Sequence, residues 1–277
     1  MHGGMKIYAG APSTARHYVE AGRGPPVVLV HGGMQDYRLW DEVMSALGPR
    51  HRVIAYSRRN HWPDSAAANG TPDGAADLHA DDLATLVRTL RLGRVHVVAH
   101  SAGAHAALFF AAAHPEMLAS LTINEPPAAG VLTTDAEHAV LARFQAQLQP
   151  AMAAFRAGQL DEGMRRFADA VGGPGGYERR TEAQRAMMRD NVAAHVADAT
   201  TARPRPVFTC EMAKRITAPV LLTRGARSPA YFHAVADALA RCLPNARQAT
   251  LDASHTVPAE DPKGFAAAVA ELLPPMR

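Results

Sequence analysis

One stretch of this 277-residue chain decides how it folds: Val95-His96-Val97-Val98-Ala99-His100-Ser101-Ala102-Gly103-Ala104-His105. Its first five residues are mostly apolar and β-branched, as in a buried strand, while residues 102–113 are rich in alanine and predict a helix. Almost no turn lies between them. A strand that becomes a helix within about two residues strains the backbone at the corner and lifts the corner side chain above the edge of the sheet. We therefore interpret the corner residue, Ser101, as a nucleophile.

Small residues surround this serine. Ala99, Ala102 and Gly103 leave the room that a tight corner needs, and the string is a Gly-x-Ser-x-Gly nucleophile elbow with Ala99 in place of the first glycine. Such a string also occurs by chance, so Ser101 as an ordinary helix N-cap is an alternative interpretation. The rest of the chain has to decide between the two.

Composition and charge limit the classes to which the protein can belong. Hydrophobic residues make up 48% of the chain, so at this length it can bury the core of one domain, or of one domain with an insertion. The net charge is +3, but basic residues come at most in pairs, such as Arg58-Arg59, and acids separate the pairs. This pattern predicts an ordinary solvated surface and no nucleic-acid partner.

Two further features concern the cell compartment. No run approaches the ~20 apolar residues of a membrane span, and Met1–Gly10 has no apolar core of signal-peptide length. We therefore predict a cytoplasmic protein that does not enter a membrane. The two cysteines, Cys210 and Cys242, are too few for a disulfide framework and have neither metal-ligand nor Cys-x-x-Cys spacing, so we expect inert free thiols.

Hydrophobic periodicity predicts alternating strands and helices through most of the chain. Short apolar or alternating runs predict eight strands, at residues 5–9, 14–20, 27–30, 52–56, 95–99, 118–124, 219–223 and 247–251. Helical spacing predicts helices at residues 37–47, 77–90, 102–113, 229–241 and 261–273. This alternation is typical of an α/β protein with a mostly parallel sheet and helices on both faces.

The pattern changes between the sixth and seventh predicted strands. Residues 133–198 are rich in alanine, methionine and arginine and have helical spacing throughout, interrupted by Gly172-Gly173-Pro174-Gly175-Gly176. We expect three or four helices here and no strand. The sequence thus predicts a helical cap at residues 129–208, inserted into a core that residues 1–128 and 209–277 form.

Candidate catalytic groups lie at the ends of the predicted strands. Ser101, Glu125 and His255 each follow a strand, and ligands of such sheets gather outside the carboxyl ends of the strands. A serine hydroxyl needs a base within hydrogen-bond reach, and the base needs a group that fixes its tautomer. His255, in the loop after the last strand, is the base that we predict.

The remaining histidines offer weaker candidates. His96 and His105 flank the elbow and are expected to pack there. We expect surface positions for the histidines on or beside predicted helices: His51, His79, His114, His138, His195 and His233. No pair has convincing zinc spacing with a third ligand, so we predict no metal site and no cofactor.

The combined motifs are similar to those of the α/β-hydrolase superfamily over essentially the whole chain. The resemblance rests on His31-Gly32-Gly33 after the third strand, the elbow at Ser101, the helical insertion after the sixth strand, and Ser254-His255 near the end. It implies the α/β-hydrolase fold, with nucleophile, acid and base in that chain order.

The resemblance also implies an oxyanion hole. In this family two backbone N–H groups form it, one just after the nucleophile and one just after the His-Gly pair. The match indicates Ala102 and Gly33, with Met34 as an alternative to Gly33. Such donors stabilise the negative charge that develops on the carbonyl oxygen, and the loss of one costs about 3 kcal/mol of transition-state stabilisation.

The predicted acid departs from the commoner pattern of the family. Most members carry it after the seventh strand, where this chain has Gly225-Ala226-Arg227-Ser228-Pro229 and no carboxylate. Some members, certain lactonases and dehalogenases among them, carry it after the sixth strand, where this chain has Glu125 followed by two prolines that stiffen the corner. We predict Glu125 as the acid. The alternative is a surface glutamate, with Asp252 as the acid instead.

Residues around the site are expected to contact a substrate. His61 and Trp62 lie where many relatives have a loop beside the active-site mouth, although an aromatic ring that packs this loop is an equally good interpretation. Apolar residues of the predicted cap are expected either to line a pocket or to form the cap's own core: Phe144, Met152, Phe155, Met164, Phe167, Met187 and Met188. Of these, Phe144 and Phe155 are our candidate pocket residues.

The leading hypothesis is a cofactor-free serine hydrolase that cleaves a carboxylic ester or lactone of a small, largely apolar molecule. Ser101 attacks, His255 transfers the proton, Glu125 orients the imidazole, and water hydrolyses the acyl-enzyme. A serine nucleophile excludes the related epoxide hydrolases and haloalkane dehalogenases, which attack with aspartate. The alternatives are a carbon-carbon bond hydrolase, a cofactor-free dioxygenase of this fold, and a ligand-binding receptor with little turnover. We expect a monomer or homodimer with a small-molecule partner.

Overall fold

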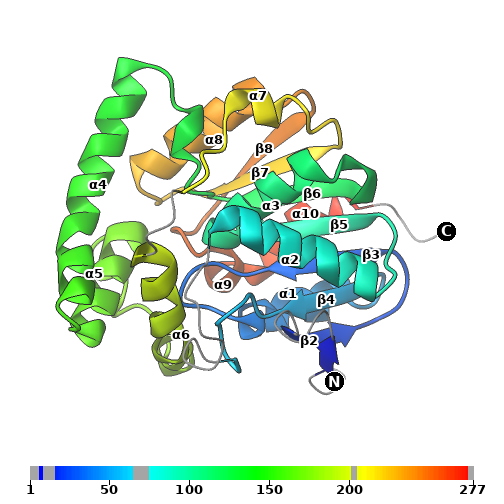
Figure 1. Cartoon of the computed structure of the whole chain (residues 1–277), viewed down its shortest axis with the longest axis horizontal. Coiled ribbons are helices and arrows are strands. Elements are labelled where there is room, and N and C mark those ends of the chain that lie inside the picture. Colours follow the sequence, from blue (N-terminus) through cyan, green and yellow to red (C-terminus); the bar gives the residue numbers. More distant parts are fainter. Residues whose placement is uncertain (1–5, 9–15, 65–74, 201–204, 274–277) are drawn as a thin grey trace.

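A computed structural model describes residues 6–8, 16–64, 75–200 and 205–273. Over these residues, eight strands form one sheet in the order β1-β2-β4-β3-β5-β6-β7-β8 (Figure 1). They are β1 (Lys6–Tyr8), β2 (Arg16–Ala21), β3 (Pro26–Val30), β4 (Arg52–Tyr56), β5 (Val95–His100), β6 (Leu118–Asn124), β7 (Val220–Gly225) and β8 (Ala246–Leu251). β2 pairs antiparallel with β1 and β4, and the other neighbours run parallel. The predicted mostly parallel, eight-stranded sheet is confirmed.

Helices cover both faces of the sheet. On one face lie α2 (Ala76–Thr89), α3 (Ser101–Ala113) and α8 (Ala230–Cys242), and on the other α1 (Asp41–Leu47) and α10 (Pro262–Ala270). The described chain also contains short helical elements: η1 (Tyr37–Trp40), η2 (Pro115–Met117), η3 (Ala129–Val131), α7 (Cys210–Ala213) and α9 (Val257–Glu260).

The two faces explain the apolar runs in the sequence. Val28 and Val30 of β3 pack into the core with α2 and α3, while Val27 and Leu29 pack into the core with α1 and α10. All four side chains are fully buried. Because side chains alternate along a strand, a strand covered on both faces must be apolar at every position.

Between β6 and β7 the described chain forms three long helices: α4 (Asp135–Arg156), α5 (Leu160–Gly172) and α6 (Glu182–Thr200). We call them the insertion helices. They lie together beside the sheet, at the left of Figure 1. α4 begins with a capping box, in which Thr134 accepts from the backbone of Glu137 and Glu137 accepts from the backbone of Thr134. The division of the chain at residues 129 and 208 remains a prediction.

The cysteines correct one expectation. Cys210, at the start of α7, and Cys242, at the end of α8, form a disulfide with their Cα atoms 5.2 Å apart. The prediction of free thiols is wrong. The two residues are 32 positions apart in sequence, and they meet only because α7 packs against α8, which sequence spacing does not reveal.

Among the helices of the described residues, none is both long enough and apolar enough to cross a membrane. The predicted cytoplasmic location also rested on Met1–Gly10, most of which lies outside the described residues. Disulfides are rare in reducing compartments, so the bond between Cys210 and Cys242 does not support that location.

Reduction of the disulfide should lower the free energy of unfolding. The bond closes a loop across 32 positions, for which the loss of chain entropy predicts about 3–4 kcal/mol. Urea unfolding of the wild type with and without dithiothreitol, and of the double variant Cys210→Ser/Cys242→Ser, measures this difference. Reductant and double substitution should lower the urea midpoint alike. Two thiols that titrate in the denatured, unreduced protein would contradict the disulfide.

Candidate active site

The corner between β5 and α3 has the geometry of a nucleophile elbow. β5 ends at His100 and α3 begins at Ser101, with no residue between them. Ser101 has a φ of +51°, a backbone conformation that residues other than glycine rarely adopt. A Cβ atom at Gly103 would lie 2.3 Å from the carbonyl oxygen of His31, so α3 approaches β3 closely only because this residue is glycine. Ser101 is the first residue of α3, and the N-cap of this helix is His100. Ser101 is therefore not the helix N-cap, which was the alternative interpretation.

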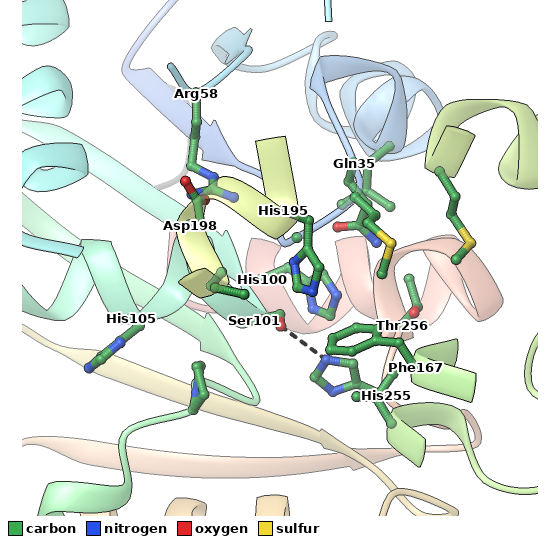
Figure 2. Close-up of a pocket in the computed structure, with 18 of the residues that line it drawn as sticks. Gln35, Arg58, His100, Ser101, His105, Phe167, His195, Asp198, His255 and Thr256 are labelled. Atoms are coloured by element: carbon green, nitrogen blue, oxygen red, sulfur yellow. Dashed lines mark hydrogen bonds and ion pairs between the residues drawn. The ribbon is translucent and has the colours of Figure 1, made fainter. Parts of the chain in front are cut away.

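Three side chains from three strand ends form one hydrogen-bonded chain. Ser101 Oγ lies 3.0 Å from His255 Nε2, as the dashed line in Figure 2 marks. His255 Nδ1 lies 2.7 Å from Glu125 Oε2. Ser101 follows β5, Glu125 follows β6, and His255 lies in the loop after β8. In this arrangement Nδ1–H donates to the carboxylate and Nε2 accepts from the serine hydroxyl.

Glu125 is held from several sides. Its side chain is buried, its φ is +48°, and its Oε1 accepts a hydrogen bond of 2.7 Å from the N–H of Gly225. Burial raises the pKa of Glu125, whereas the N–H of Gly225 favours the carboxylate form. The alternative acid, Asp252, has a side chain that is 92% exposed and pairs with Arg227 at the surface. Glu125, and not Asp252, is the carboxylate that contacts His255.

His255 is enclosed by other rings. It is 4% exposed and stacks on Phe232, with the ring centres 4.1 Å apart. The ring of His100 lies 4.9 Å away on another side. Burial, with a further contribution from the positive charge of Arg180, lowers the pKa of His255 to about 3. The imidazole is therefore uncharged at neutral pH, as a general base must be.

The predicted oxyanion-hole residues lie beside the serine. Gly33, Met34 and Ala102 all line the same cavity as Ser101. Ala102 belongs to the first turn of α3, where backbone N–H groups have no acceptor within the helix and are free to bind an anion.

A buried arginine fixes the loop that carries Gly33. Arg58 is 1% exposed, and its guanidinium donates to the carbonyl oxygens of His31 and Gly32. Its backbone N–H also donates to His31 Nε2, 2.9 Å away. The sequence did not single out Arg58, because a pair of adjacent arginines is also typical of a solvent-exposed surface.

A cavity of about 930 Å³ opens above Ser101, between the insertion helices and the strand ends. Apolar side chains dominate its lining: Phe144, Leu148, Met152, Phe167, Met187, Met188, Phe208 and Phe232. Phe144 thus lies in the predicted place. Phe155 and Met164 do not line the cavity and pack instead into the core of the insertion helices.

His61 and Trp62 also lie outside the lining of the cavity. His61 is fully buried, with its ring nitrogens against the guanidinium of Arg58 and the carbonyl oxygen of Arg59. The ring of Trp62 lies 4.0 Å from the guanidinium carbon of Arg38. Both side chains hold the loop in place, in line with the alternative interpretation of these residues.

One end of the cavity is polar, which sequence reasoning did not predict. Figure 2 shows Arg58 and Asp198 on the same side of Ser101, where Arg58 Nη1 lies 3.6 Å from Asp198 Oδ2. His79 and His195, which we expected at the surface, line the cavity as well. His195 lies so close to the loop that carries Gly33 that a Cβ atom at Gly33 would be 2.6 Å from its Nδ1. Helical spacing correctly predicted that both histidines lie on helices, but it did not reveal that those positions face the cavity.

Comparisons with known proteins agree with this fold. The family model described as alpha/beta hydrolase fold matches residues 25–262. The 2-(acetamidomethylene)succinate hydrolase of Mesorhizobium japonicum is 29% identical over 215 residues, which are 76% of this chain and 73% of that protein.

Solved structures show the same architecture. Est816, described as an N-acyl homoserine lactone degrading enzyme, superposes with a TM-score of 0.74 at 21% identity, over 97% of this chain and 100% of its own. The enol-lactonase from Burkholderia xenovorans LB400 superposes with a TM-score of 0.72 at 22% identity, over 96% of this chain and 98% of its own. Because the family model spans most of the residues and the fold agrees, the chain belongs to the α/β-hydrolase family of enzymes.

Proposed function

We propose that this enzyme is a serine hydrolase that cleaves a carboxylic ester or lactone of a small, largely apolar molecule. The observation that carries the proposal is the hydrogen-bonded chain from Ser101 through His255 to Glu125, which lies at the floor of an apolar cavity. Nucleophile, base and orienting acid with these contacts are what acyl transfer requires.

The reaction follows from the roles of these groups. Ser101 Oγ attacks the carbonyl carbon while His255 Nε2 takes its proton, and Glu125 stabilises the imidazolium that forms. The N–H groups of Gly33 and Ala102 donate to the oxyanion. His255 then returns the proton to the leaving oxygen, which in a lactone stays attached to the acyl group. Water, activated by the same histidine, hydrolyses the acyl-enzyme.

Related proteins support this type of reaction. Est816 and the enol-lactonase are named for lactones, and the protein from Mesorhizobium japonicum is named for the hydrolysis of 2-(acetamidomethylene)succinate. The apolar lining supports a substrate with an apolar body, because burial of such a body in a preformed apolar cavity is favourable. We also propose that residues 129–208 act as a cap, since side chains of all three insertion helices line the cavity.

Substitution of the proposed triad should separate Glu125 from Asp252. We expect Ser101→Ala to lower kcat/KM for 4-nitrophenyl butyrate by at least about 10⁴-fold, and Glu125→Gln by about 10³–10⁴-fold, because each removes one member of the triad. Asp252→Asn, at an exposed position, should stay within about twofold of the wild type. Initial rates measure the effects, and circular dichroism checks that each variant folds.

Labelling with a fluorophosphonate, together with activity and binding assays, distinguishes this proposal from the dioxygenase and receptor alternatives. If Ser101 is an activated nucleophile, the fluorophosphonate forms a covalent adduct with the wild type and none with Ser101→Ala. A dioxygenase that uses only His255 and Glu125 would keep its activity in Ser101→Ala. Tight ligand binding with no ester hydrolysis by the folded wild type would favour a receptor. Either result would overturn the proposed function.

The pH profile tests the state of His255. The neutral imidazole is the active base, and burial lowers its pKa. With Glu125 kept ionised by its hydrogen bonds to Gly225 and His255, activity should persist below pH 6.5 and fall only as the pH drops through the lowered pKa of His255. A histidine of pKa about 6.5 would lose roughly nine tenths of kcat/KM between pH 7.5 and 5.5, whereas we expect most of it to remain. Activity measured again at pH 7.5 after incubation at pH 5.5 controls for unfolding.

A loss of activity near neutral pH would point to Glu125 instead of His255. Burial raises the pKa of Glu125 to about 8. If burial outweighs the hydrogen bonds that Glu125 accepts, the proposed reaction, which needs the carboxylate, loses activity as the pH falls through that raised value. An acidic limb with its midpoint at or above pH 6.5 would therefore contradict the prediction and assign the limb to Glu125.

A further inference from the structure

Arg180 places a positive charge in the cavity with little to balance it. It lies in the segment between α5 and α6 and lines the cavity. Within the described residues, its guanidinium donates to Thr256 Oγ1 across 3.4 Å, while its Nε is buried without an acceptor. Thr256 is the residue after His255, so this charge lies at the catalytic end of the cavity.

The other described arginines that line the cavity are satisfied by the protein itself: Arg38, Arg58 and Arg205. Arg38 and Arg58 form ion pairs with carboxylates. Arg205 donates to carbonyl oxygens at the end of α6. Arg180 differs from all three, since a hydroxyl at the limit of hydrogen-bond distance does not neutralise a guanidinium.

Nearby acidic residues do not fill this role. Glu260 and Asp169 attract the guanidinium of Arg180 from a distance, but within the described residues neither forms an ion pair with it. Glu260 accepts from the backbone N–H of Ser254 at 2.8 Å, and Asp169 accepts from the N–H of Tyr177 at 2.9 Å. Burial lowers the pKa of Arg180.

The position of Arg180 is built into the local chain. Its neighbour Arg179 donates to the carbonyl oxygens of Gly172 and Pro174 and so ties the glycine-rich segment to the end of α5. Arg180 N–H closes a turn onto the carbonyl oxygen of Tyr177. A partly buried cation that is held in place but left unpaired costs stability, and an anion that enters the cavity would recover this cost.

We propose that Arg180 binds a carboxylate of the substrate, so that the substrate is an acyl compound with an apolar body and a free carboxylate. This inference rests on the proposed hydrolase function and narrows its substrate class. The planar guanidinium matches a carboxylate with two parallel hydrogen bonds. A singly charged carboxylate neutralises one arginine, whereas a phosphate dianion would bring an excess charge into a mostly apolar cavity.

A matched pair of esters tests the inference: mono-4-nitrophenyl glutarate, and 4-nitrophenyl pentanoate, in which a methyl group replaces the carboxylate. We expect Arg180→Gln to lower kcat/KM for the glutarate ester about 10- to 100-fold, the usual range for a charge-assisted hydrogen bond. The pentanoate ester should change by less than about threefold. Arg180→Lys keeps the charge without the planar fork and should recover part of the loss.

A control variant removes the same charge elsewhere. Arg189→Gln deletes an exposed arginine of α6 that pairs with Glu182, and it should leave both esters unaffected. An equal loss for both esters in Arg180→Gln would mean that Arg180 only supports the structure. Equal loss, or no loss for the glutarate ester, would overturn the inference while leaving the serine-hydrolase proposal intact.

Binding separates this inference from the function on which it rests. If neither ester is hydrolysed, the proposed function fails, and calorimetric titration with glutarate still tests Arg180. Glutarate should bind the wild type and Arg189→Gln alike, and its affinity for Arg180→Gln should be at least tenfold lower. Equal affinity for all three proteins would overturn the role of Arg180.

Discussion

The imidazole of His255 makes a hydrogen bond on each side, through Nε2 to Ser101 and through Nδ1 to Glu125. Both bonds can form only if β5, β6 and β8 end at the same edge of the sheet, which parallel strands ensure. The insertion helices add a second restraint. His255 stacks on Phe232, and Phe232 packs edge-on against Phe144 of α4. The orientation of one ring therefore depends on the sheet and on the insertion together.

Gly225 shows how Glu125, the proposed acid, is held after β6. A Cβ atom at this position would lie 2.4 Å from the carbonyl oxygen of Ser254, so the loop that carries His255 approaches β7 only because residue 225 is glycine. The same close approach directs the N–H of Gly225 to Glu125. The end of β7, where most relatives place a carboxylate, here supplies a hydrogen-bond donor to the carboxylate that comes from β6. The proposed acid from one strand end is thus held by a donor from the next.

Much of this could be predicted from the sequence, because local periodicity and strand-end motifs carry it. Residues 52–56 and 118–124 form strands with the predicted bounds. Ser101, Glu125 and His255, which were selected because each follows a predicted strand, are in contact in the structure. Contacts between segments far apart in the chain could not be predicted. The disulfide depends on how α7 packs on α8, and the cavity wall depends on which sides of the insertion helices turn toward the sheet. A single sequence has no local signal for either.

Arg180 links recognition to chemistry through one charge. Burial is the main reason for the lowered pKa of His255, and the positive charge of Arg180 lowers it further. A carboxylate bound to Arg180 would cancel that second contribution, so His255 would become more basic when an acidic substrate is present. The imidazolium that forms as Ser101 attacks would be stabilised at the same time, because the positive charge of Arg180 would then be paired. An arginine left without a partner in the protein can thus favour one substrate class both in binding and in the proton transfer that follows.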